Sequence, residues 1–384
     1  MLVGLLASPA FAGSWSWRPR RTATTTTITT ARLPTTTLAG GPLATAPTTA
    51  APTTTAPAPT SAPTAAPTTT VPAPTTTLPI AGAPAGGAAA IAPLEAGLLL
   101  YDGEVAPGDF ELFTARPDGT AVRRLTSDPA TNAWWPRSSP DRTRIVFYRT
   151  AAGALPGTYA QASLWIMNAD GTDARVLLPA GVNGWTFQAH AEWSPDGRRI
   201  VFTAGSNQAQ ITTIAPDGTD LRVLGGGPGA NVDPVYTPDG RSIVYVGCPT
   251  WSCGTPDTEV FAMAADGSGT RTRLTTDTVR DNDPVVSPDG ASIAVLSQTD
   301  APSEGAPHGA WNLRTLRIDG SEIRQITSGT ALSSAPRWSP DGRRIWTHRI
   351  AFDRYAWDLV SMNVDGSDLQ LLCATYTQEF LAFT

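Results

Sequence analysis

A short phrase, Ser/Thr-Pro-Asp followed by an apolar run, recurs at intervals of roughly fifty residues through the second part of the chain. Its five copies begin at Ser139, Ser194, Thr237, Ser287 and Ser339. In each copy a tight turn leads into a β-branched or aromatic segment such as Ile200-Val201-Phe202. A repeat of this length predicts a series of equivalent supersecondary units rather than separately folded domains.

A second signature alternates with the first. An apolar segment such as Leu164 to Ala169 ends in Asp-Gly and is followed by a short segment containing Arg and Leu, such as Arg175 to Leu177. The Asp-Gly pairs begin at Asp118, Asp170, Asp217, Asp266, Asp319 and Asp365. Glycine supplies the positive φ that closes a hairpin. The complete unit is therefore four antiparallel strands, which is the blade of a β-propeller.

The two signatures occur in unequal numbers, because six Asp-Gly hairpins accompany only five Pro-Asp turns. Leu98 to Tyr101 opens the repeats where a second strand belongs, and Gln378 to Phe383 follows the last hairpin where a first strand belongs. Pairing these two ends would remove two exposed sheet edges. The sequence therefore predicts an all-β, six-bladed propeller closed by strands from both ends of the chain.

The composition divides the 384 residues into three parts. Residues 1–12 resemble a truncated signal peptide, with Ala10-Phe11-Ala12 fitting a cleavage site. Residues 13–94 are rich in Thr, Pro and Ala, with too little apolar bulk to offset the entropy of ordering, so we expect a disordered linker or stalk. Residues 95–384 hold the propeller.

The signal-like start, the Thr/Pro-rich tract and the cysteines favour a location outside the cytoplasm, whether secreted, periplasmic or tethered to the cell surface. The net charge is −6 and no basic stripe with interleaved aromatic residues occurs, so nucleic acid is not an expected partner. No segment is long and apolar enough to span a bilayer, and we expect a monomer. Cys248 and Cys253 lie in one expected loop and are candidates for a disulfide in an oxidising compartment.

The repeats resemble the TolB-type propeller repeat, a Pro-Asp type relative of the WD-repeat family. Trp193 to Phe202 and Trp338 to Ile345 match its first half, and Leu164 to Leu177 matches its second half. One departure is Arg142, which replaces the turn glycine of the first copy. The resemblance covers residues 95–384 and implies the fold rather than a function.

The recurrent aspartates of the turns have an expected structural role, because an Asp there accepts backbone N–H groups and stabilises the bend. They are Asp141, Asp196, Asp239, Asp289 and Asp341. If the strands of a blade run from inside to outside, the turns lie on one face of the disc and the longer, more variable loops lie on the other. We therefore expect binding at the channel mouth on the loop face.

The candidate binding residues come from the starts of the inner strands. Four residues before the turn Ser or Thr, the copies differ more in chemistry than the turns do. The candidates are Trp135, His190, Asp233 and Asp283 at these positions, together with Asn282, which precedes Asp283. Such a set would suit a cation, a sugar or a peptide terminus, and water-filled channel lining is the alternative. We assign no cofactor and no metal site; a calcium ion at the channel mouth has no direct support.

The sequence favours a non-catalytic extracytoplasmic binding module that uses the loop face to hold a protein partner or a small ligand. No G-x-S-x-G elbow and no catalytic residue set is identified. Two alternatives stay open. One is a propeller-type lyase or glycosidase acting at the channel mouth, and the other is a propeller related to the non-catalytic domain of serine peptidases. Convergence of His190, Asp233 and Asp283 around a perturbed carboxylate would favour the lyase or glycosidase.

Overall fold

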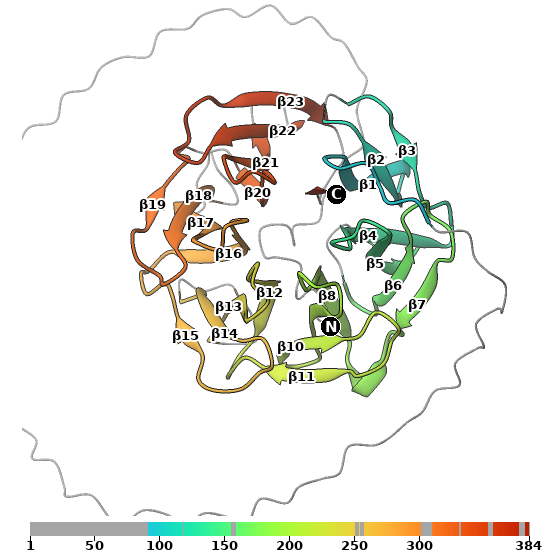
Figure 1. Ribbon diagram of the computed structural model, residues 1–384, viewed down its shortest axis with the longest axis horizontal. Helices are drawn as coiled ribbons and strands as arrows, with labels where there is room; N and C mark the ends of the chain where they lie inside the picture. The colour runs from blue at the N-terminus through green and yellow to red at the C-terminus, as the bar shows by residue number, and fades with distance from the viewer. Residues whose placement is uncertain are drawn as a thin grey trace, which may run out of the picture. The chain divides into compact units, whose positions relative to one another are not determined.

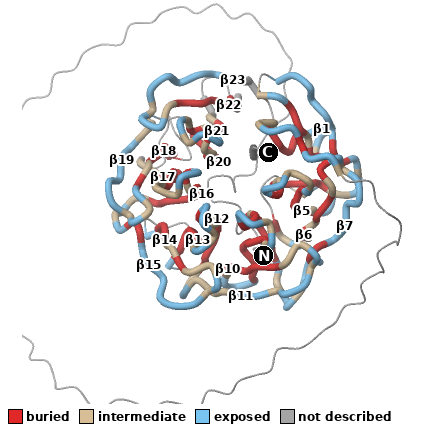
Figure 2. The backbone as a smooth tube through the Cα atoms, viewed as in Figure 1, coloured by how far each residue is buried: buried red, intermediate tan, exposed pale blue. Residues whose placement is uncertain are grey.

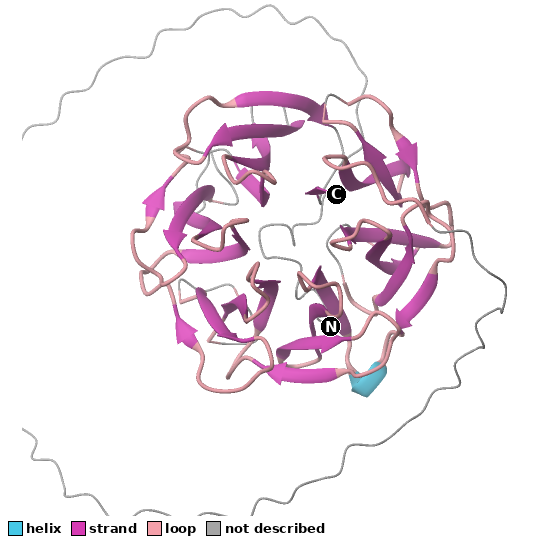
Figure 3. Cartoon of the chain, viewed as in Figure 1, coloured by secondary structure: helices cyan, strands magenta, loops and turns pink. Residues whose placement is uncertain are grey.

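The computed structural model describes residues 91–383, apart from residue 118 and the segments 155–158, 250–252, 254–256, 301–308, 330–331, 352–355 and 376–380. In this part of the chain, six four-stranded antiparallel blades surround a central channel, and one parallel bridge, Trp311↔Leu332, joins the fifth blade to the sixth (Figure 1). The regular structure is almost entirely β, with one short 3₁₀ turn, η1 (Val182–Gly184) (Figure 3). The six-bladed all-β propeller predicted from the repeats is confirmed.

Each blade contains four strands, which follow one another outward from the channel. Blade 1 is β24 (Leu381–Phe383), β1 (Leu99–Ala106), β2 (Asp109–Ala115) and β3 (Arg123–Arg124). Blade 2 is β4 (Thr131–Ser138), β5 (Arg144–Ala151), β6 (Ser163–Asn168) and β7 (Arg175–Leu178). Blade 3 is β8 (Phe187–Trp193), β9 (Ile200–Gly205), β10 (Ala209–Ile214) and β11 (Arg222–Gly225).

The second half of the ring repeats the pattern. Blade 4 is β12 (Asn231–Tyr236), β13 (Ser242–Gly247), β14 (Glu259–Ala264) and β15 (Thr272–Arg273). Blade 5 is β16 (Arg280–Val286), β17 (Ser292–Asp300), β18 (Ala310–Arg317) and β19 (Arg324–Gln325). Blade 6 is β20 (Leu332–Trp338), β21 (Arg344–Ala351), β22 (Ala356–Asn363) and β23 (Gln370–Thr375).

The ring closes through β24, which pairs antiparallel with β1 in the register Leu99↔Phe383 to Tyr101↔Leu381. On the other side of this closure, Leu99 and Tyr101 pack against Leu359 of blade 6. The expected pairing of the two chain ends is confirmed. It removes the free edge that β1 would otherwise present.

The core lies between neighbouring blades, so both faces of a middle strand are covered (Figure 2). Ile200, Val201 and Phe202 of β9 are all fully buried, although successive side chains of a strand point to opposite faces. This double burial explains the continuous apolar runs that follow the Pro-Asp turns. Upstream of β1, Leu94 is also buried and its N–H donates to Arg142 O, so the packed chain begins slightly before residue 95.

The described residues contain no helix long and apolar enough to cross a membrane. Residues 1–90, which include the expected signal peptide and nearly all of the expected linker, lie outside the described residues.

Candidate functional site

The predicted site residues occupy equivalent β-bulges in the inner strands of the ring. In blades 2 to 6 the register of the inner strand shifts in mid-strand, so one extra residue faces the partner strand. The residue at each shift has a left-handed backbone, with φ between 47° and 57°. These residues are Trp135, His190, Asp233, Asp283 and Ala335.

Such a conformation costs a non-glycine residue roughly 1–2 kcal/mol, so the surrounding strands must impose it. In four of the five strands the next residue is proline, at positions 136, 234, 284 and 336. Proline has no N–H to donate to the ladder and is tolerated at a bulge. The X-Pro pair four residues before the turn is therefore the sequence signal for these positions.

His190 and Asp233 form an ion pair between blades 3 and 4, through Nδ1 and Oδ1. Both side chains are 4% exposed. The imidazole lies between two aromatic rings, with centroid distances of 4.6 Å to Trp135 and 5.4 Å to Tyr159. Burial lowers the pKa of His190, but the Asp233 carboxylate outweighs that effect, and the net pKa is raised above 6.5.

Asp283 extends this pair into blade 5. Its N–H donates to Asp233 Oδ2 at 3.4 Å, and its own side chain is only partly exposed. Burial, and then repulsion from the Asp233 carboxylate, raise the pKa of Asp283 to about 7, against the opposing effects of His190 and Arg137. The structure thus brings His190, Asp233 and Asp283 together as a network that crosses three blades.

Of the remaining candidate residues, Trp135 joins this network and Asn282 lies beside it. The Trp135 indole N–H donates to Ala191 O in blade 3 at 3.2 Å. Asn282 is 1% exposed, and neither amide atom of its side chain has a hydrogen-bond partner among the described residues. Nearby, burial lowers the pKa of Arg280 to about 10, and its guanidinium lies 5.1 Å from the Trp311 ring centroid.

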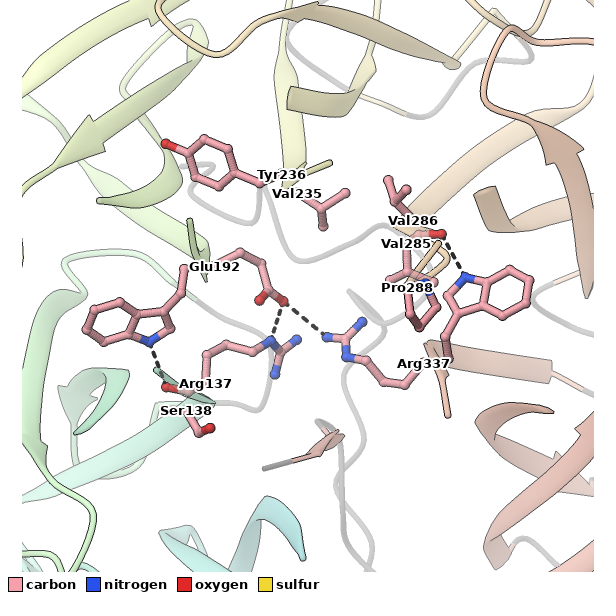
Figure 4. A pocket seen from close by; sticks show the side chains of 11 residues that line it. Arg137, Ser138, Glu192, Val235, Tyr236, Val285, Val286, Pro288 and Arg337 are labelled. Atoms are coloured by element: carbon pink, nitrogen blue, oxygen red, sulfur yellow. Dashed lines mark hydrogen bonds and ion pairs between the residues drawn. The ribbon is translucent and has the colours of Figure 1, made fainter. Parts of the chain in front are cut away.

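A hollow of about 280 Å³ lies beside the channel (Figure 4). Along each inner strand its lining residues stand nearer the turn than the bulge residues of this network do. Its lining comes from the last two residues of five inner strands and from Pro288 of a turn. We call this end of the channel the turn rim and the opposite end the loop rim. The sequence placed binding at the loop rim, and several of the connections expected there fall outside the described residues. That expectation stays a prediction.

Three charged side chains meet in the hollow. The carboxylate of Glu192 contacts the guanidinium groups of both Arg137 and Arg337, and its Oε1 lies 3.5 Å from Arg337 Nη2 (Figure 4). Burial raises the pKa of Glu192, and Arg137 opposes that effect. Sequence reasoning missed this trio, although all three stand two residues before a turn serine, where other blades have valine.

The trio is held in place by aromatic residues. Arg137 lies 4.3 Å and Arg337 lies 5.9 Å from the centroid of the Trp135 ring. Trp193 and Trp338 donate their indole N–H groups to Arg137 O and Val285 O of neighbouring blades, at 3.0 and 3.1 Å (Figure 4). Trp135 therefore contacts both the His190 network and the arginines of the hollow.

The turn aspartates fold their own loops. In all five turns the Ser or Thr hydroxyl donates to Oδ1 of the aspartate two residues later, at 2.5–2.6 Å. The same carboxylates accept backbone N–H groups at 3.0–3.1 Å. Away from the channel, Cys248 and Cys253 form a disulfide with a Cα–Cα distance of 5.1 Å.

Among the described residues, three acidic side chains lie close enough together to share a metal ion. They are found between blades 4 and 5 and do not include the aspartates of the β-bulges. One ligand atom each of Glu259, Asp277 and Asp281 lies within 4.8 Å of the others. Arg273 pairs with Glu259 at 2.5 Å, and Arg314 pairs with Asp277 at 2.5 Å. Two guanidinium groups thus already balance most of this negative charge, and the cluster is better described as an ion-pair network.

Comparison with known proteins identifies relatives of the repeats. The family described as TolB beta propeller domain matches residues 180–380. A dipeptidyl-peptidase 5 of Porphyromonas endodontalis is 30% identical over 108 residues, or 28% of this chain and 15% of the peptidase. An uncharacterised protein of Agrobacterium fabrum is 27% identical over 205 residues, or 52% of this chain and 61% of the relative. The chain thus spans less than two thirds of either relative.

Among solved structures, TolB from Acinetobacter baumannii superposes with a TM-score of 0.58 and 19% identity. The match covers 74% of this chain and 66% of that protein. At this level of identity the similarity concerns the fold, and function has to be argued from the channel itself.

Proposed function

The chain belongs to the TolB beta propeller family, and on this premise we propose that it is a binding module that receives a segment of a protein partner in its channel, outside the cytoplasm. The observation that carries the proposal is the turn-rim hollow, which residues of five blades line and where three charged side chains meet beside valines and parts of large aromatic residues. Binding sites combine an apolar lining with a few oriented polar groups in this way.

The volume of the hollow limits what enters it. At about 280 Å³ it lies just below the range of roughly 300–1,000 Å³ that is typical of small-molecule pockets. It suits one or two side chains of a longer segment whose remaining contacts lie on the rim. A rigid ring that presents a small, charged receptacle fits recognition of an extended peptide better than enclosure of a whole substrate.

A photo-crosslinking experiment tests the proposal. A benzophenone amino acid replaces Ser138, which lines the hollow, in the full chain, and the matched control replaces Val176, which is 44% exposed on β7. We expect the same partner to be crosslinked in cells from position 138 and not from position 176. Equal labelling from both positions, or labelling from neither, would count against a channel receptor.

A second function, acid–base catalysis at the channel, has a specific observation in its favour. His190, Asp233 and Asp283 are linked by an ion pair and a backbone hydrogen bond, and a carboxyl group with a pKa of about 7 is suited to exchange protons at neutral pH. However, His190 and Asp233 are buried against each other and beside aromatic rings, and Asp283 is only partly exposed with its Oδ1 buried, so a substrate would have little access to these groups. Turnover of oligosaccharides that is abolished by Asp283→Asn would establish this alternative.

A further inference from the structure

The turn-rim hollow has an unbalanced charge. Its lining contains two cationic side chains, Arg137 and Arg337, and one anionic side chain, Glu192. The hollow therefore carries a net charge of +1 when all three are ionised. One additional carboxylate would make the site neutral, because each guanidinium would then have one anionic group to match it.

The Arg137 guanidinium also has a hydrogen-bond donor, Nη2, that is not used among the described residues. The Arg137 side chain is 4% exposed. Its Nε donates to Glu192 and its Nη1 donates to Pro136 O at 2.9 Å. A buried guanidinium with an unused donor is costly, and an acceptor brought by a ligand would remove that cost.

The arginines are arranged before any ligand arrives. Both guanidinium groups lie against the Trp135 ring, at 4.3 and 5.9 Å, and both contact the same Glu192 carboxylate. Ring contact and shared pairing restrict the rotamers of two long side chains. Binding would then lose less side-chain entropy than it would with two mobile surface arginines.

The apolar residues that line the hollow favour an anion attached to an apolar group over a small inorganic anion. Val235, Val285 and Val286 line the hollow. Trp193, Tyr236 and Trp338 also contribute to its lining, although their side chains pack against the core clusters between blades and the Tyr236 ring points away from the centre of the hollow (Figure 4). Inorganic phosphate would gain nothing from these apolar side chains. A carboxylate attached to an apolar residue would place its charge at the arginines and its side chain against the valines.

We propose that the turn-rim hollow captures the C-terminal carboxylate of a partner protein that ends in an apolar residue, between the guanidinium groups of Arg137 and Arg337. The proposal deepens the binding function above and rests on it. Glu192 serves in the empty site as an internal carboxylate that keeps the two arginines together.

Fluorescence anisotropy with the full chain tests this chemistry. The probe is fluorescein-Gly-Ser-Gly-Ala-Val-Leu with a free carboxylate; a second probe is its C-terminal amide, and a third is an amide whose last residue is Glu. We expect the free carboxylate to bind at least about tenfold more tightly than either amide. Equal binding of the Glu amide would instead identify an acidic side chain as the ligand and overturn the C-terminal assignment.

Three variants locate the site. Arg337→Gln should weaken binding of the free-carboxylate probe about tenfold, whereas Glu192→Gln should tighten it, because a competing carboxylate is lost. Arg222→Gln is the matched control, because Arg222 is an exposed arginine in an ion pair on β11, and it should leave binding unchanged. Circular dichroism verifies that each variant is folded. Equal losses in the Arg337 and Arg222 variants would overturn the proposal.

The result separates this proposal from the function on which it rests. If no probe binds at up to about 1 mM while position 138 still crosslinks a partner, the carboxylate assignment fails and the binding function stands. If phosphate at equal concentration displaces the probe as well as unlabelled peptide does, the hollow is a general anion site and the assignment also fails.

Discussion

His190 of blade 3 and Asp233 of blade 4 form an ion pair in the channel wall, and each side chain is only 4% exposed. The pair connects two blades at their bulges, and Asp283 extends it to a third. A short network of side chains thus adds to the apolar packing that already holds these blades together.

Removing one member of this pair should be costly. Asp233→Asn would leave a buried imidazole without its carboxylate, and we expect a loss of about 3–5 kcal/mol in the free energy of unfolding, measured by urea denaturation. The matched control Asp257→Asn changes an exposed aspartate and should cost less than about 0.5 kcal/mol. A similar loss in both variants would show that the pair contributes little.

The pH dependence of stability should reveal Asp283. Its folded pKa of about 7 lies above the unfolded value of about 3.9, so the folded state holds the proton more tightly. Its stabilising contribution is complete below the unfolded pKa and is lost as the pH rises to about 7. His190, whose pKa is also raised, acts in the same direction.

We therefore expect unfolding free energy to contain a component that falls between pH 4 and 7, by at most about 1.4 kcal/mol per pH unit for one group. Asp283→Asn should make this component less steep, and the share of Asp281, whose pKa burial also raises to about 7, should remain. Urea midpoints at a series of pH values measure it, and an unchanged slope in the variant would contradict the assignment to Asp283.

The first turn contains a stability defect that can be repaired. Arg142 has φ 59° where Gly197, Gly240, Gly290 and Gly342 stand in the other turns with φ 68–72°. Arg142→Gly removes left-handed strain and keeps the backbone bonds to Ser139 and Leu94. We expect the variant to be more stable by about 0.5–1 kcal/mol. Gly197→Ala is the reverse control, and it should destabilise.

Ring closure can be tested by deletion. Removing residues 378–384 eliminates β24 and leaves the inner edge of β1 unpaired. We expect lower cooperativity of urea unfolding and concentration-dependent association on size-exclusion chromatography. Adding back the deleted segment as a synthetic peptide should reverse both effects, and a truncated chain that behaves like the intact one would contradict a closed ring.

Much of the fold could be predicted from repeats because each signature has a local physical cause. Positive φ at the turn glycines and Asx-type bonding by Asp196 and its counterparts depend on neighbours in the chain. Runs such as Ile200 to Phe202 are buried by neighbouring blades, but that burial leaves a continuous apolar pattern that can be read in each repeat. The unequal numbers of turns and hairpins also predicted the pairing of β1 with β24.

The candidate site could be predicted only in part. Counting four residues back from the turn found the bulge positions, because equivalent positions in equivalent strands lie at one height in the ring. Counting two residues back from the turn would have found Arg137, Glu192 and Arg337. However, two other repeats have valine at this position, and no local pattern marked the three charged residues as members of one site. The hollow also lies at the turn rim, whereas loop length had pointed to the loop rim.

The sequence alone determined the six-bladed ring, its turns and its closure, since these follow from periodicity, glycine and proline geometry and the need to pair strand edges. Only the tertiary structure decided which channel residues meet. His190 pairs with Asp233 across blades, and Glu192 contacts arginines of blades 2 and 6. Those contacts depend on side-chain direction and on the curvature that brings distant strands around one channel, and neither is encoded in local spacing.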